Sequence, residues 1–350
     1  MLGNTGFEGI LNLNGGVLQA FVVQGYNGPS YTPVTSGLLN FNGGTLRASD
    51  NNGGFVSVDQ IHVYSGGATI DNNGFSVAVS QALLAPTGNG VNGFSSFTGG
   101  SGYIAPPIVT ITNGTGDTTG FGATAIAQIN PVTGAVTNIL ITCPGWDYTV
   151  TPVFVISGGG ATTAATVTGN APTASTSGGL TSTGSGTNYL AGANTYTGNT
   201  TVSSGTLELA QAAIANGSTV SIATGAKLQL DFSTTNLIAA LVLNGSSQAA
   251  GVYSAATSPS FISGTGKLQV GTPIANYSTN LSFTVTGGGT TMSLTWPTTH
   301  LGWILQSQTN SLSAGLSATW FDVAGSASVT STSVGINPAS PTVFFRLRHP

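Results

Sequence analysis

Residues 39–46 read LNFNGGTL, and this phrase decides the fold class of the chain. Apolar and polar side chains alternate on both sides of an Asn-Gly-Gly corner, which indicates two short β-strands joined by a tight turn. Nearly the same phrase, LNLNGGVL, stands at residues 11–18, and a looser copy, VYSGGATI, stands at residues 63–70. Three later copies read GTLEL at 205–209, GAKLQL at 225–230 and GTGKLQV at 264–270.

The spacing of these copies favours turns of chain that stack on one another. Leu228 follows Leu207 by 21 residues. Leu268 follows Leu228 by 40 residues, which predicts two further turns, and Leu241 and Leu243 are expected to fill the middle one. A period near 20 residues is typical of a β-solenoid, in which turns about 4.8 Å apart share a core that one turn alone could not bury.

The composition agrees with an all-β solenoid. Only 4% of the residues are charged, against about 25% in ordinary soluble domains. Uncharged Thr, Ser and Asn can stack on themselves in register, whereas like charges at this spacing would repel one another. The net charge of -4 argues against electrostatic capture of nucleic acid. No segment reaches the roughly 18 apolar residues of a membrane span, so none is expected.

Changes of pattern divide the chain into five predicted parts. Residues 100–111 (GSGYIAPPIVTI) are echoed at 145–156 (GWDYTVTPVFVI), a repeat that differs from the solenoid copies and indicates a separate small β module. Within it, residues 123–129 and 136–141 predict a hairpin. The predicted parts are a β-solenoid at 1–90, an inserted Gly-Ser-Gly-Tyr-type β module at 91–170, a flexible Ser/Thr/Gly-rich linker at 171–189, further β-solenoid at 190–274 and a C-terminal β-sandwich at 275–350.

Residues 191–207 read AGANTYTGNTTVSSGTL and closely resemble the autotransporter-associated β-strand repeat. Residues 293–306 and 344–347 resemble a module that ends very large repeat proteins of Verrucomicrobia-like bacteria. The resemblance implies a right-handed parallel β-helix passenger, exported and displayed outside a Gram-negative-type cell, with no catalytic residues to transfer. Residues 1–10 lack the basic and apolar regions of a signal peptide, so we expect the chain to be the C-terminal part of a longer repeat protein.

Aromatic residues recur at matched positions of the inserted module, namely Tyr103, Trp146 and Tyr148. Exposed rings at these positions could stack on the sugar rings of a glycan. A small β module also needs large side chains to anchor its core, and this favours core positions for the three residues. The same argument favours core positions for Trp296, Trp303 and Trp320 of the C-terminal part.

Acidic residues in the first solenoid stretch raise the alternative of a polysaccharide lyase, which needs clustered carboxylates with calcium or a basic residue. Asp50, Asp59 and Asp71 lie near Arg47 and His62 in sequence. Both Asp50 and Asp71 begin the phrase DNNG, which is an ideal corner sequence because Asp and Asn tolerate positive φ. This favours turns over a site. Farther along, Glu208 and Asp231 are expected to be isolated and solvated.

These patterns predict a non-catalytic structural or adhesive surface protein, with a glycan-binding module or a β-helix lyase as the alternative. The expected partner is an extracellular polysaccharide or another cell surface. No catalytic residue, metal site or cofactor is expected, because His62, His300 and His349 lack metal-ligand spacing. The single Cys143 is interpreted as a small buried residue rather than a nucleophile.

Overall fold

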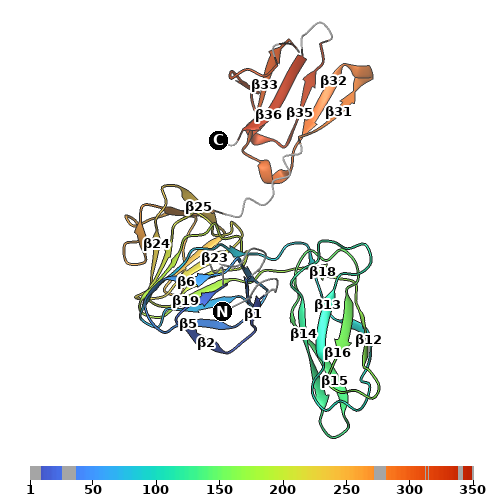
Figure 1. Cartoon of the computed structure of the whole chain (residues 1–350). Helices are drawn as coiled ribbons and strands as arrows, with labels where there is room; N and C mark the ends of the chain where they lie inside the picture. The colour runs from blue at the N-terminus through green and yellow to red at the C-terminus, as the bar shows by residue number, and fades with distance from the viewer. Residues whose placement is uncertain are drawn as a thin grey trace. The chain divides into compact units, whose positions relative to one another are not determined.

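The structure is a computed structural model that describes residues 9–25, 37–271, 281–311, 313, 315–337 and 342–348, although not the side chain of Thr299 (Figure 1). The chain forms two compact units, Met1–Pro273 and Ile274–Pro350. The described residues form β-strands and three short 3-10 helices, with no α-helix among them. The predicted all-β class is therefore confirmed. His349 lies outside the described residues.

Three sheets with parallel pairing make up most of the first unit. The first sheet contains β1 (Gly9–Leu13), β4 (Gly37–Phe41), β7 (Gln60–Val63) and β10 (Leu83–Leu84). The second contains β2 (Val17–Ala20), β5 (Thr45–Ala48), β8 (Ala68–Asp71), β19 (Leu180–Thr183), β21 (Thr200–Val202), β23 (Thr219–Ile222), β26 (Ala240–Leu243) and the antiparallel β27 (Ser246–Ser247). The third contains β3 (Val23–Gln24), β6 (Asn52–Ser57), β9 (Ser76–Val79), β20 (Thr187–Leu190), β22 (Thr206–Leu209), β24 (Lys227–Leu230) and β29 (Ile262–Gly264).

Each early pass of the chain adds one strand to each sheet in turn, which is compatible with a β-helix. Alternate side chains of each strand point into one continuous core that runs from Leu13 to Val270. Leu207 pairs with Leu228 in register, as their spacing predicts, and both are fully buried. Corners depend on glycine: Gly43 has φ 101°, and a Cβ on Gly44 would collide with Leu13.

The predicted flexible linker at 171–189 is wrong in its second half. β19 pairs with β8 on one side and β21 on the other, and β20 pairs with β9 and β22 in the same way. Leu180 and Asn188 are each only 1% exposed. The parallel sheets therefore resume at residue 180 rather than 190, because residues that would suit a linker stack in register here, as Thr181 does between Thr69 and Thr201.

The predicted middle turn between Leu228 and Leu268 also differs. Leu228 pairs with Ile262 of β29, and Leu241 stacks on Val220 in the second sheet. Leu268 instead pairs with Asn236 in a separate three-stranded sheet of β25 (Thr235–Ile238), β30 (Lys267–Val270) and β28 (Gly251–Tyr253). An excursion of the chain between β26 and β29 breaks the period at this point.

The inserted module follows β10 and precedes β19, within a single pass of the parallel sheets. Its antiparallel strands are β11 (Asn89–Gly90), β12 (Phe94–Thr98), β13 (Ile108–Thr112), β14 (Thr124–Asn130), β15 (Ala135–Cys143), β16 (Val153–Ser157), β17 (Thr166–Gly169) and β18 (Thr173–Ala174). The predicted hairpin is the pair β14–β15, and the two echoed segments meet as β13 paired with β16. The module has a hydrophobic core of its own. Its strands lie within the predicted bounds of 91–170 except for the short pair β11–β18, which lies just outside them.

The second unit contains two antiparallel sheets. One consists of β31 (Ser282–Thr286), β32 (Thr291–Thr295) and β35 (Ser331–Gly335), and the other of β34 (Phe321–Asp322), β33 (Ile304–Asn310) and β36 (Thr342–Arg348). Leu294 from one sheet and Leu305 from the other share a core with Trp296. Trp296 is thus in the core as predicted, whereas Trp303 and Trp320 are half-buried outside that cluster.

Candidate functional site

Two of the three candidate glycan-binding aromatics lie inside the inserted module. Tyr103 and Tyr148 are 4% and 2% exposed and belong to its core. The Tyr103 hydroxyl accepts a hydrogen bond of 2.8 Å from the backbone N–H of Ala165, which connects two distant segments of the module. Neither ring offers a face to a sugar, so burial supports the anchoring role for both residues.

Trp146 has a different position, against the first parallel sheet. Its ring stacks on His62 with centroids 4.1 Å apart, and Phe121 packs on it at 5.2 Å. In the first echoed segment the corresponding residue is Ser101, which forms an isolated bridge with Thr163, as Trp146 does with Phe121. The two copies therefore differ at this position, and only the second has the aromatic side chain that contacts a solenoid strand.

Polar side chains on the outer face of the first sheet extend this contact. Asn12, Asn40 and His62 are neighbours in register on β1, β4 and β7. The Asn40 amide donates to Asn12 Oδ1 at 2.8 Å, and the Asn12 amide donates to Thr124 Oγ1 of the module at 2.7 Å. The module thus supplies hydrogen-bond partners as well as a hydrophobic cover for this face.

Titratable groups at this contact are held neutral by burial. Burial lowers the pKa of His62 to about 4, although the nearby charge of Asp147 acts in the opposite direction and raises it. Burial also raises the pKa of the Cys143 thiol and of the neighbouring Tyr64 hydroxyl. Because the thiolate is the nucleophilic form, Cys143 is an inert buried residue, as the sequence favours.

A cavity of about 200 Å³ lies beside this contact, bordered by Tyr64, Val91, Pro144 and Ser175 among others. None of the residues that line it is charged. Proton abstraction from an acidic sugar requires a base and a group that neutralises the carboxylate. The lining has no Lys, Arg or His that could neutralise such a carboxylate.

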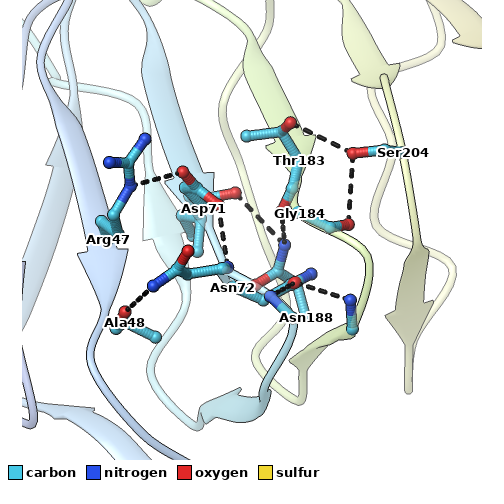
Figure 2. A network of polar contacts seen from close by, with 12 residues as sticks. Arg47, Ala48, Asp71, Asn72, Thr183, Gly184, Asn188 and Ser204 are labelled. Atoms are coloured by element: carbon cyan, nitrogen blue, oxygen red, sulfur yellow. Dashed lines mark hydrogen bonds and ion pairs between the residues drawn. The ribbon is translucent and has the colours of Figure 1, made fainter.

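A second polar group lies at the corner between the second and third sheets, where Asp71 and its neighbours meet residues that follow the inserted module (Figure 2). Arg47 donates to Asp71 across adjacent strands at 2.7 Å. Asn72 is fully buried, and its Oδ1 accepts from the N–H groups of Gly74 and Gly186 at 3.0 and 2.8 Å. Asn188 donates to Ser182 Oγ at 2.8 Å.

This corner group connects strands that lie more than a hundred residues apart in sequence, as in the Asn72–Gly186 bond. Its contacts are backbone amides, carbonyls, side-chain hydroxyls and one ion pair, and the carboxylate of Asp71 and the amide oxygen of Asn72 accept from neighbouring parts of the corner. The arrangement joins the sheets on the two sides of the inserted module. It presents no free acid–base pair for chemistry.

Replacing Asn72 by alanine is expected to lower the free energy of unfolding of the first unit by about 2 kcal/mol. Two backbone N–H groups, those of Gly74 and Gly186, would lose their acceptor in a partly buried corner. Urea unfolding followed by circular dichroism measures the change. As a control, Asn216→Ala removes an exposed amide of the same unit that makes no side-chain hydrogen bond to another described residue, and its effect should stay within about 0.5 kcal/mol. Equal stability of Asn72→Ala and the parent would contradict the role given to this bond.

The acidic residues of the lyase alternative each have a local hydrogen-bond partner. Asp59 accepts from the Gly37 N–H at 2.5 Å, Asp50 is exposed and accepts from Asn51, and Asp71 pairs with Arg47. No group of three His, Cys, Asp or Glu side chains that could hold a metal occurs in the described ranges. The prediction that the DNNG phrase forms a corner with a residue at positive φ is confirmed after Asp71, where Asn73 has φ 52°. At Asp50 the turn forms without a positive φ.

The expectation that Glu208 and Asp231 are isolated is wrong. Pairing of β22 with β24 places Glu208 beside Gln229, two residues before Asp231. Burial, and then a hydrogen bond and repulsion from Asp231, raise the pKa of Glu208. The two carboxyl groups form a close pair on the outer face of the third sheet, and no third His, Cys, Asp or Glu among the described residues joins them in a metal-binding group.

The segment that resumes the parallel sheets after the module matches one known family model. Residues 180–209 match the model of the passenger-associated-transport-repeat. The matched transport repeat spans β19 to β22, which is one pass through the second and third sheets and the start of the next. No curated protein and no solved structure matches the chain. In the described part of the chain, no helix has the length and apolar character needed to cross a membrane.

The transport repeat supports an autotransporter passenger repeat in this chain, and with it a surface or secreted protein. The matched residues also explain the local fold. Tyr196 is fully buried in the shared core, and its hydroxyl bonds Thr200 at 2.7 Å. Burial raises the pKa of Tyr196 to about 12, so the hydroxyl stays neutral inside the stack.

Proposed function

We propose that this chain is a non-catalytic, structural or adhesive part of a passenger displayed outside a Gram-negative-type bacterium. The observation that carries the proposal is the transport repeat at 180–209, which stacks in register on strands from both ends of the solenoid. We also propose that the parallel sheets form a right-handed β-helix and that the C-terminal unit is a β-sandwich of the kind that ends Verrucomicrobia-like repeat proteins.

The mechanical design suits a spacer. Seven parallel strands of the second sheet, from β2 to β26, would extend about 30 Å at about 4.8 Å per strand. The inward side chains of these strands belong to one continuous hydrophobic core, so the stack is expected to be stiff along its length. The near absence of charge supports this role, since every outward column can repeat Thr, Ser or Asn without repulsion.

Surface display is tested on intact cells of the bacterium that produces the protein. Antibodies raised against the purified chain are expected to label intact cells, and external proteinase K should remove the label. Label that appears only after the cells are permeabilised would refute the proposed location. Antibodies against a cytoplasmic protein provide the control for cell integrity.

The absence of catalysis is tested separately. The purified chain is expected to release neither unsaturated sugars nor reducing ends from pectate, alginate or neutral glucans. If one of these polymers were cleaved, and if Asp71→Asn abolished the cleavage, the lyase alternative would replace the structural role. Calcium should be included in a parallel assay, because the carboxylates that the lyase alternative invokes are oxygen ligands of the kind that Ca²⁺ binds.

A further inference from the structure

Basic residues are rare in this chain, yet two of them stand side by side on one strand of the C-terminal unit. The whole sequence has five Lys and Arg, and β36 contains both Arg346 and Arg348. Residues two apart in a strand project from the same face of the sheet. Arg346 is opposite Gln306 of β33, which in turn is opposite Asp322 of β34.

Arg346 is held from two sides although it is exposed. Its Nε donates to Gln306 Oε1 at 2.8 Å, and its Cζ lies 4.3 Å from the centroid of the Trp320 ring. Gln306 is only 6% exposed, and its amide donates to Asp322 Oδ1 at 2.5 Å. A surface arginine ordinarily samples many rotamers, so this clamp pre-organises the guanidinium group.

The loop that leads to Trp320 is anchored in the same way. Gln308 is 3% exposed, and its Oε1 accepts from the backbone N–H of Ser317 at 2.8 Å. The Gln308 amide donates back to the Ser317 carbonyl at 3.3 Å. Two buried glutamines on one strand therefore position an aromatic ring and a guanidinium group toward the surface.

The charges of this face do not cancel. Arg348 lies 3.5 Å from Asp322, which leaves Arg346 without a carboxylate among the described residues. Only its Nε has a hydrogen-bond acceptor there, so the two terminal nitrogens are available to a ligand. Their fork geometry matches both oxygens of a carboxylate. The neighbouring Trp320 ring is the kind of side chain that contacts sugar rings.

We propose that this face, formed by Trp320, Arg346 and Arg348 above the buried Gln306, binds the carboxylates of a polyuronate glycan. Arg346 holds one uronate carboxylate in a bidentate contact, and Trp320 with Arg348 lines the path of the adjoining sugars. One net positive charge suits a single uronate, whereas nucleic acid needs several phosphate contacts. The inference rests on the extracellular placement proposed above, because such glycans are extracellular.

The test is calorimetric titration of the purified full chain with a defined oligogalacturonate, compared with a maltooligosaccharide of the same length. Binding is expected for the uronate only, and it should weaken as salt rises. Arg346→Gln and Trp320→Ala should each weaken it about tenfold or more. Arg346→Lys keeps the charge but loses the fork, so it should weaken binding as well.

The matched control is Lys267→Gln, which removes one exposed positive charge from β30 in the other unit and should leave binding unchanged. The proposal is overturned if the parent chain does not bind, if both oligosaccharides bind equally, or if Lys267→Gln weakens binding as much as Arg346→Gln. Circular dichroism verifies that each variant is folded. A negative result leaves surface display intact, since labelling of cells tests that separately.

Discussion

Gly186→Ala is expected to lower the free energy of unfolding of the first unit by about 3 kcal/mol or more. Gly186 directly precedes β20, and a Cβ on it would fall on the carbonyl oxygen of Phe75 in the neighbouring pass. That oxygen belongs to the backbone and accepts from the N–H of Thr187 at 2.9 Å. No side-chain rotation can relieve the clash, so the two passes must separate and weaken the Gly186–Asn72 bond.

Urea unfolding followed by far-ultraviolet circular dichroism measures this effect. Gly217→Ala is the matched control, since no heavy atom lies within 4 Å of the Cβ that alanine would add there and its φ is not in the left-handed region. The control should change stability by no more than about 0.5 kcal/mol. Unfolding of Gly186→Ala at the same urea concentration as the parent would show that the passes are not packed this closely.

Acid is expected to destabilise the contact between the inserted module and the first sheet by up to about 3 kcal/mol between pH 6.5 and pH 4. His62 is 3% exposed and stacked on Trp146, and burial lowers its pKa from 6.5 to about 4. In that window the unfolded chain binds a proton that the folded chain does not. The stabilising contribution is therefore complete above pH 6.5 and is lost progressively as the pH falls to about 4.

His62→Phe keeps a ring against Trp146 and removes the titration, so its stability should vary less across this window than that of the parent. Urea midpoints at pH 7, 5.5 and 4 provide the comparison. Asp117 does not affect the comparison: hydrogen bonds from Thr119, Thr149 and Gly120 lower the pKa of its carboxyl, and the stability that this contributes is lost below about pH 5 in both proteins alike. Identical pH profiles for the parent and His62→Phe would exclude His62 as the cause.

Several features of the fold are predictable because they depend on local pattern. The alternation around residues 39–46 predicts short strands and glycine corners, and the 21-residue spacing predicts the pairing of Leu207 with Leu228. The echoed segments at 100–111 and 145–156 predict a separate module. Each of these signals lies within a few tens of residues, so strand period and turn chemistry are enough to detect it.

Other features escape the sequence because Thr, Ser and Gly suit both linkers and stacked strands. Residues 180–189 have linker-like composition, and only their neighbours in the sheets, 69–79 on one side and 200–209 on the other, order them. Trp320 is a large aromatic residue of the kind that anchors a core, yet its ring lies under the guanidinium group of Arg346 at the surface. A side chain's environment depends on partners that are distant in sequence.

The amino-acid sequence by itself determined that this protein is all-β, nearly ion-free and built from repeats of about 20 residues, because alternation and corner chemistry act over neighbouring residues. Only the tertiary structure decided that the parallel sheets continue across the inserted module, that Trp146 packs on His62, and that Arg346 is clamped beside Trp320. These contacts join segments that are tens to more than a hundred residues apart. Their formation depends on which surfaces complement each other after the strands have stacked.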